Sequence, residues 1–311
     1  MFGAVVLLTG CGGTQFPSAT VGGAQSSALR GIDRHGSSWM SPLAKHKTLI
    51  YVSSPTDSSV YVFTYPAGKP AGMLTGFVDP LGLCSDKSGN VWVSNGDYYN
   101  GYGTMIEYAH GGTQPIATLD DYGSSPQACS VDPSTGNLAV ADLAAGSAEN
   151  IAIWAGAQGS PTYYSTVGIV EDPATITYDG TGDVYFAAWR DHRGWLAKGS
   201  SSVERFTINP RRDGWFAWDG KYLAIGESVV LRYQLSGAKG KKTGSPTNLS
   251  DVKVRGQFWI QGTKLAIATP GEGSQGGQGH VYIYDYPQGG NPISTIAGLD
   301  QPYGVTVSAF R

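Results

Sequence analysis

Charge and cysteine are both scarce in this sequence of 311 residues. Charged residues make up only 14% of it, and the formal net charge is −3. Neither a basic stripe nor a run of like charge is present, so nothing in the charge pattern favours nucleic acid or an acidic membrane surface as a partner. Cysteine occurs at only three positions, 11, 84 and 129.

The common catalytic and cofactor motifs are missing as well. No His and Cys spacing suggests a zinc site, no Gly-rich loop precedes a helix to hold phosphate, and no Gly-x-Ser-x-Gly sequence occurs. The five histidines are scattered along the chain. The sequence therefore offers no residue to name as catalytic and predicts no resident cofactor, which favours a non-catalytic role.

Long amphipathic helical stretches are absent too, and short β-type segments recur in their place. A strand-turn-strand unit runs from Pro80 to Asn95 and returns from Pro126 to Asp142 and from Pro173 to Trp189, with weaker copies at 213–227 and 255–269. A period of this length is typical of one four-stranded propeller blade. Equivalent positions in successive copies are Asp86, Asp132, Asp179, Asp219, Gln261 and Ser308, separated by 46, 47, 40, 42 and 47 residues.

The repeated aspartates are interpreted as turn residues. Asp86, Asp132, Asp179 and Asp219 each precede a Gly-containing turn that leads into a short apolar run. An Asp side chain accepts hydrogen bonds from the backbone of a tight turn, and Gly accepts a positive φ there. The sequence therefore predicts a structural role for these carboxylates.

The two ends of the repeat region each carry half a blade. Leu49–Ser53 matches a second strand with no first strand before it, and 301–308 matches a first strand with no partner after it. Pairing them completes the last blade and hides an exposed sheet edge. We therefore predict an all-β fold, a six-bladed β-propeller over residues 46–311, closed by its C-terminal strand.

The N-terminus carries a short targeting-type motif. An apolar run is followed by Leu8-Thr9-Gly10-Cys11, which resembles the lipobox of bacterial lipoproteins, although no Lys or Arg precedes the run. The resemblance implies a signal over residues 1–11, lipidation of Cys11, and a protein anchored to a membrane in the cell envelope, outside the cytoplasm. Residues 12–45, rich in Gly and Ser, then form a flexible tether. The alternative is a soluble protein whose N-terminus is apolar by chance.

Two interpretations remain open for Cys84 and Cys129. Both fall on first strands of neighbouring blades, at even and odd offsets from the turn Asp, so their side chains leave opposite faces of the two sheets. Because neighbouring blades meet through opposite faces, the thiols can face each other and form a disulfide. The alternative is two small buried core residues.

Two loops depart from the repeat, and they are the predicted ligand-binding elements. Both follow second strands, on the face where one blade connects to the next. Aromatic, Arg and polar side chains on loops of a rigid scaffold suit a protein or carbohydrate partner. The alternative is that these side chains only cover the ring. The residues are Asn95, Tyr98 and Tyr99 in the first loop, and Trp189, Arg190, Asp191 and His192 in the second.

The repeat resembles the NHL-type repeat, and it is also similar to the propellers of streptogramin lyases, gluconolactonase-like enzymes and bacterial lipoproteins. The resemblance rests on the Pro, Asp and Gly-Asn pattern of the copies and covers about residues 46–311. Gluconolactonase-like enzymes hold a divalent metal at the ring axis. Here Asn95, Asp142 and Glu227 end second strands and offer oxygen atoms to a metal such as Ca²⁺, but they do not match that family's motifs residue by residue. Two functions follow: a binding module, which we favour, or a metal-dependent lactonase or lyase.

Overall fold

The computed structural model describes residues 36–97, 101–144, 150–188, 192–210, 214–250, 252–271 and 278–310. The lipobox with Cys11 lies outside these ranges. Among the predicted binding residues, Tyr98, Tyr99, Trp189, Arg190 and Asp191 lie outside them too. Within the described ranges no helix has the length and apolar character needed to cross a bilayer.

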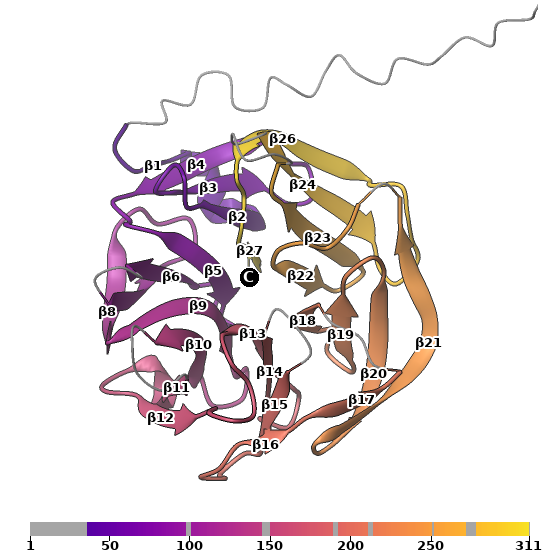
Figure 1. The fold of residues 1–311 in the computed structure, drawn as a ribbon. Helices are drawn as coiled ribbons and strands as arrows, with labels where there is room; N and C mark the ends of the chain where they lie inside the picture. The colour runs from indigo at the N-terminus through magenta and orange to yellow at the C-terminus, as the bar shows by residue number, and fades with distance from the viewer. Residues whose placement is uncertain are drawn as a thin grey trace, which may run out of the picture.

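Six sheets stand around one axis, each with an antiparallel four-stranded core, and this confirms the predicted six-bladed β-propeller (Figure 1). The first strand of each blade lies nearest the axis. From the axis outward, blade 2 contains β5 (Pro80–Ser85), β6 (Val91–Asp97), β7 (Tyr102–Tyr108) and β8 (Pro115–Tyr122); blade 3 contains β9 (Ser124–Val131), β10 (Leu138–Ala144), β11 (Asn150–Trp154) and β12 (Thr162–Ser165); blade 4 contains β13 (Pro173–Tyr178), β14 (Val184–Ala188), β15 (Arg193–Leu196) and β16 (Glu204–Arg205).

Blades 5 and 6 follow the same plan, and blade 5 gains additional outer strands. Its longest strand pairs in parallel with short segments from both neighbouring blades. Blade 5 contains β18 (Trp215–Trp218), β19 (Leu223–Gly226), β20 (Val230–Ser236) and β21 (Lys239–Leu249), with β17 (Thr207–Asn209) and β25 (Gly289–Gly290) beside β21; blade 6 contains β22 (Phe258–Gln261), β23 (Lys264–Thr269), β24 (Gln278–Asp285) and β26 (Ser294–Asp300).

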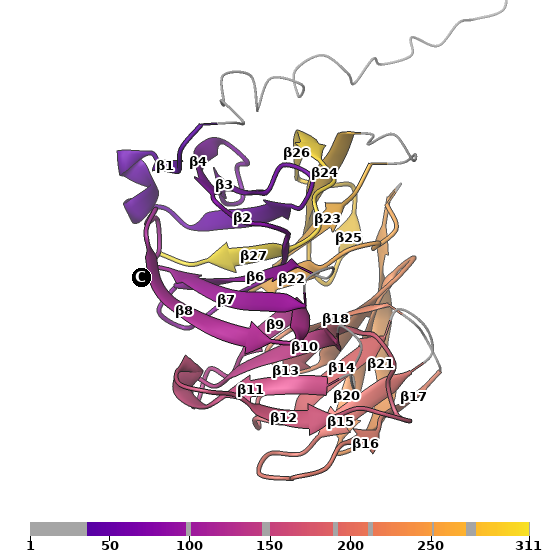
Figure 2. The ribbon, with the colours of Figure 1, turned by 60° about the vertical axis from the view of Figure 1, so that its left-hand side comes forward.

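Blade 1 is built from both ends of the chain. The last strand, β27 (Val305–Ser308), pairs antiparallel with β2 (Leu49–Ser54), and Leu49 lies opposite Ser308. Both views show indigo β2 beside yellow β27 (Figures 1 and 2). The predicted closure is therefore confirmed, and the pairing removes an open sheet edge from the ring. Outside β2 lie β3 (Ser59–Thr64), β4 (Pro70–Thr75) and β1 (Trp39–Met40).

The start of the ring lies earlier than the sequence indicated. β1 pairs with β4, and the short 3₁₀ segment η1 (Pro42–His46) places Ala44 in the core of blade 1. Met40 packs against the same core. The predicted tether of residues 12–45 must therefore end before β1, because its last part is folded onto the propeller.

The inner strands are apolar on both faces because each blade packs between two others. β2 is buried along its whole length, and β19 is buried along all of Leu223–Gly226. Strands buried on both faces read as continuous apolar runs rather than as alternating patterns. The short apolar runs after each turn in the sequence are therefore the central strands of the blades.

The repeated aspartates are turn residues, as predicted. Asp86 Oδ1 accepts hydrogen bonds from the backbone N–H groups of Ser88 and Asn90, both at 2.8 Å. Asp179 Oδ1 accepts from the backbone of Thr181, Gly182 and Asp183. These turns join first to second strands, and the face that carries them (86–90, 132–137, 179–183, 219–222 and 262–263) is called the turn face below. The opposite face, which carries the connections between blades, is the loop face.

A disulfide joins Cys84 on β5 to Cys129 on β9, with the Cα atoms 5.6 Å apart. Both residues are buried in one apolar cluster with Trp92 and Trp154. Blades 2 and 3 are thus linked covalently near the axis. Of the two interpretations, the structure therefore has the disulfide and not two separate core thiols.

Candidate ligand-binding site at the propeller axis

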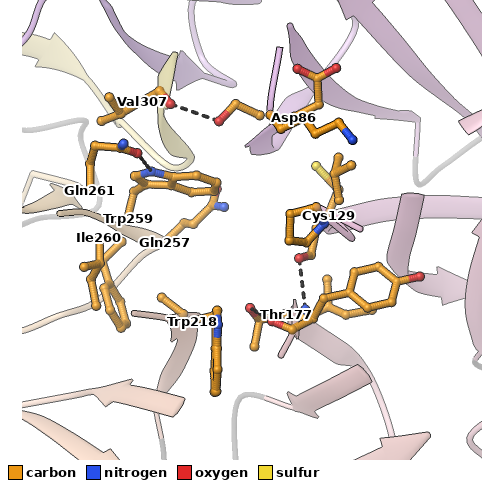
Figure 3. Close-up of a pocket in the computed structure, with 18 of the residues that line it drawn as sticks. Asp86, Cys129, Thr177, Trp218, Gln257, Trp259, Ile260, Gln261 and Val307 are labelled. Carbon is orange, nitrogen blue, oxygen red and sulfur yellow. Dashed lines mark hydrogen bonds between the residues drawn. The ribbon is translucent and has the colours of Figure 1, made fainter. Parts of the chain in front are cut away.

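A cavity of about 240 Å³ opens at the axis on the turn face (Figure 3). Residues at the ends of all six first strands line it, including Ser85 of β5, Val131 of β9 and Val307 of β27. The cavity exists because the six strands end in a ring around the axis and leave the centre open between their turns. It lies on the face opposite the ends of β6 and β14, the strands that precede the two loops singled out in the sequence.

Aromatic side chains form much of the cavity wall. Trp218 ends β18 and Trp259 lies within β22, and both are half-buried. Figure 3 shows the Trp259 ring beside the open space, with Cys129 and Thr177 across from it. Tyr178 completes the wall, and burial raises the pKa of its phenol well above the ordinary value. The wall therefore offers apolar ring faces to whatever enters.

Gln257 occupies the axis at the inner end of this wall. Its Oε1 accepts from the backbone N–H of Leu83 at 2.9 Å, and its Nε2 donates to the Leu83 carbonyl at 2.6 Å. The backbone N–H of Val305 reaches the same Oε1 at 3.3 Å. A single buried amide thus connects blade 6 to blade 2 and to the closing strand. Because both ends of this amide are used, Gln257 is a structural part of the cavity rather than a free ligand contact.

Polar groups at the mouth of the cavity are more accessible. Gln261 is exposed, and its Oε1 accepts from Trp259 Nε1 at 3.4 Å. Lys87 is exposed in the turn after β5. Asp86 also lines the mouth, although its Oδ1 is held by the turn backbone. The site combines apolar rings with an amide and an ammonium group, which together can orient a small polar ligand.

Two of the predicted loop residues are described, and they lie in different blades. Asn95 Oδ1 accepts from the backbone N–H groups of Val78 and Asp79, at 2.8 and 3.2 Å, and its Nδ2 donates to Thr104 at 3.2 Å. Asn95 therefore fixes the connection from blade 1 to blade 2. His192 is half-buried in blade 4, where its carbonyl accepts from Ala188 at 3.0 Å. The structure does not bring these two side chains together.

The three residues considered for an axial metal come from blades 2, 3 and 5. Asn95 uses its oxygen on backbone N–H groups, and Asp142 is directed at Asp121 of β8, the outermost strand of blade 2. Glu227 follows β19, and its carbonyl accepts from the backbone N–H of Val254. The described residues include no group of three or more His, Cys, Asp or Glu side chains placed to hold a metal ion.

Sequence patterns name Asp142 only as a candidate metal ligand, and nothing in them pairs it with Asp121. Both carboxyl groups are fully buried between blades 2 and 3, and Tyr163 donates to Asp121 Oδ1 at 3.0 Å. Burial, followed by the charge of Asp121, raises the pKa of Asp142 well above its ordinary value. Burial also raises the pKa of Asp121, while hydrogen bonds from Asp142 and Tyr163 lower it in part. Burial and mutual repulsion therefore favour a protonated form of the pair over one with two charges.

Comparison with solved structures supports the architecture. A chain in a crystal structure of a nidogen/laminin complex has a TM-score of 0.62 and 12% identity, and the match covers 85% of this chain and 99% of that one. A protein of unknown function from Bacteroides caccae has a TM-score of 0.60 and 12% identity, with 84% and 99% covered. A functionally unknown protein from Desulfotomaculum acetoxidans has a TM-score of 0.55 and 13% identity, with 84% and 98% covered.

These structural similarities concern the fold alone. No protein-family model matches the sequence, and no curated protein does. Identities of 12–13% between propellers carry no information about ligands, because one propeller scaffold serves many functions. The axial cavity and its side chains are the features that bear on function.

Proposed function

We propose that this protein is a binding module that takes the end of a carbohydrate into the axial cavity. Sugars present apolar C–H faces and a rim of hydroxyl groups, so they bind where aromatic rings and hydrogen-bonding groups converge. The cavity volume of about 240 Å³ lies below the roughly 300–1,000 Å³ of typical small-molecule sites. It therefore suits one terminal sugar unit rather than a long oligosaccharide segment.

The main support for carbohydrate binding is the hydrogen bond between the side chains of Trp259 and Gln261. The half-buried indole borders the open space, and its N–H is directed at the Gln261 amide oxygen. This leaves the amide N–H groups of Gln261 available to hydroxyl groups of a ligand that stacks on the indole. Trp218 supplies a second ring on the neighbouring blade, blade 5.

We also propose that the protein is located at the cell envelope. Lipidation of Cys11 would anchor the chain to a membrane of the cell envelope, with the ring outside the cytoplasm, where disulfides persist. The Cys84–Cys129 disulfide supports an oxidising compartment. In cells that express the full chain, Cys11→Ser should move the protein from the membrane fraction to the soluble fraction and abolish labelling by a fatty-acid analogue. Unchanged membrane retention would contradict the anchor.

A glycan array probed with the full chain tests the binding function. We expect retention on a subset of glycans that share one terminal sugar, with retention reduced by free monosaccharide of the same kind. Release of a shortened or rearranged product from a bound glycan or lactone, dependent on added Ca²⁺, would favour the lactonase or lyase alternative. Uniform absence of retention across the array would contradict carbohydrate binding.

A further inference from the structure

A second cavity, of about 250 Å³, lies between blades 3 and 4 on the turn face, the same face as the axial cavity. It is called the seam cavity below. Figure 1 shows the two blades side by side, and the ends of β11, β12, β13 and β15 border the space between them. The segments that surround it, 132–137, 153–164, 178–184 and 196–200, are described without a gap.

The seam cavity adjoins the axial cavity at Tyr178, the last residue of β13. Tyr178 lines both cavities. The turn after β9 also contributes to both, with Pro133 at the axial cavity and Asp132 at the seam cavity. The two spaces are therefore separated by about one residue, and one continuous chain of sugar units can cross from one to the other.

The floor of the seam cavity is apolar apart from one phenol hydroxyl. It belongs to the core shared by blades 3 and 4 and includes Ile153, Val184 and Leu196. Tyr178 belongs to the same core, and its hydroxyl is buried with no hydrogen-bond partner among the described residues. Burial, followed by the charge of Asp132 and the phenol of Tyr164, raises the pKa of Tyr178, so its hydroxyl keeps the proton and can donate. A buried hydroxyl without a partner is costly, so an acceptor that reaches it is favoured.

Two further hydrogen-bond donors lie at the rim, one on each blade. Lys198 of blade 4 is exposed and has no ion-pair partner among the described residues. Its backbone N–H donates to Asp183 Oδ1 at 2.8 Å, which fixes the turn that carries it. Asn137 of blade 3 accepts from the Gly156 N–H through Oδ1, at 2.9 Å, and this leaves its Nδ2 available to a ligand. The carboxylate of Asp132, by contrast, is held by hydrogen bonds within its own turn.

We propose that the seam cavity binds the second unit of a carbohydrate chain whose terminal unit occupies the axial cavity. This inference rests on the proposed binding of carbohydrate at the axis, and it narrows the ligand to chains of two or more units. The two cavities have nearly equal volumes, about 240 and 250 Å³, and each suits one sugar unit. Oxygen atoms of the second unit accept from Lys198, Asn137 and Tyr178, while its C–H face packs on the apolar floor.

Calorimetric titration of the full chain with matched pairs of sugars tests this inference. Each pair holds a monosaccharide and a disaccharide with the same terminal unit: glucose and cellobiose, galactose and lactose, N-acetylglucosamine and chitobiose, mannose and mannobiose. In a pair that binds, the disaccharide should bind at least tenfold more tightly than the monosaccharide. Lys198→Met should reduce this gain at least threefold and leave the monosaccharide affinity unchanged. Lys69→Met is the matched control, because Lys69 is exposed in the corresponding turn of blade 1, between β3 and β4, and this variant should keep the full gain.

A second variant tests the cavity itself. Ala155 is exposed and lines the seam cavity, so Ala155→Leu narrows the space and should lower the disaccharide affinity to that of the monosaccharide. Loss of the gain in either variant supports the second subsite. The inference is overturned if the disaccharide binds no more tightly than the monosaccharide, or if both variants keep the full gain. Monosaccharide binding without that gain leaves the axial site in place, whereas absence of binding by every sugar contradicts both sites.

Discussion

The carboxyl groups of Asp121 and Asp142 are both buried inside the interface between blades 2 and 3, where each influences the pKa of the other. Asp121 lies on the outermost strand of one blade and Asp142 on the second strand of the next, and neither has measurable solvent exposure. Two carboxylates cannot both be ionised in such a dry site, because like charges repel and burial disfavours charge. The interface between these blades is therefore most stable with one shared proton.

Replacing Asp142 with Asn should change how stability depends on pH. The pKa of Asp142 is raised in the folded protein, so the folded state holds a proton that the unfolded chain releases. Stability of the wild type is therefore full below the ordinary Asp pKa, near 4, and falls as the pH rises toward the folded pKa, by up to about 1.4 kcal/mol per pH unit. Asn mimics the protonated acid and removes this loss.

Thermal melts from about pH 4 to about pH 9 measure the effect. Asp142→Asn should match the wild type at the acidic end and exceed it increasingly as the pH rises. Asp120→Asn is the matched control. Asp120 directly precedes Asp121 in the sequence but is exposed to solvent, and it accepts hydrogen bonds from the hydroxyl groups of Tyr102 and Tyr122. A difference between Asp142→Asn and wild type that stays constant with pH would contradict the shared proton.

Gln257→Ala should destabilise the ring. The substitution leaves the Leu83 N–H and carbonyl without their partner at the axis. Each unsatisfied buried polar group costs about 1–3 kcal/mol, so we expect a loss of up to roughly 2–6 kcal/mol for the two groups, lessened where water enters from the cavity. Denaturant unfolding measures the loss. Gln261→Ala serves as the control, because this neighbour is exposed at the mouth, and equal loss in both variants would contradict the role given to Gln257.

The disulfide should contribute measurably to stability. It closes a loop with a sequence separation of 45 residues, and a cross-link of this kind typically contributes about 2–4 kcal/mol. Cys84→Ala with Cys129→Ala should lower the midpoint of denaturant unfolding, and a reducing agent should lower the wild-type midpoint but not that of the variant. Thiol titration of denatured, unreduced protein provides the direct count. Free thiols at both Cys84 and Cys129 would contradict the bond.

Much of this fold is predictable from sequence, because propeller blades repeat their local chemistry. Asp86 and Asp179 predict turns, because their carboxylates accept hydrogen bonds from backbone N–H groups only two or three residues later. Closure by β27 is predictable for a related reason: Leu49–Ser54 lacks an inner neighbour, and Val305–Ser308 lacks an outer one. Both inferences depend only on neighbours in sequence or on the register of the repeat.

The candidate site is less predictable, because it depends on what the ring brings together. In the sequence, Trp218 and Trp259 look like ordinary core aromatics of β-strands. They line a cavity only because the axis of the ring is open beside them. Asp121 reads as part of a connection between blades, yet its side chain meets Asp142 of the following blade. Loop composition directed attention to Asn95, whose side chain serves the local backbone. Contacts between blades have no signature in a single sequence.

Calorimetric titration of the full chain with the monosaccharide that the glycan array identifies measures binding at the axial cavity. We expect saturable binding at one site, weakened at least tenfold, or about 1.4 kcal/mol, by Trp259→Ala. Trp39→Ala should leave the affinity unchanged, because Trp39 is exposed on the outer edge of blade 1. Absence of binding, or equal affinity in wild type and Trp259→Ala, would contradict a carbohydrate site at the propeller axis.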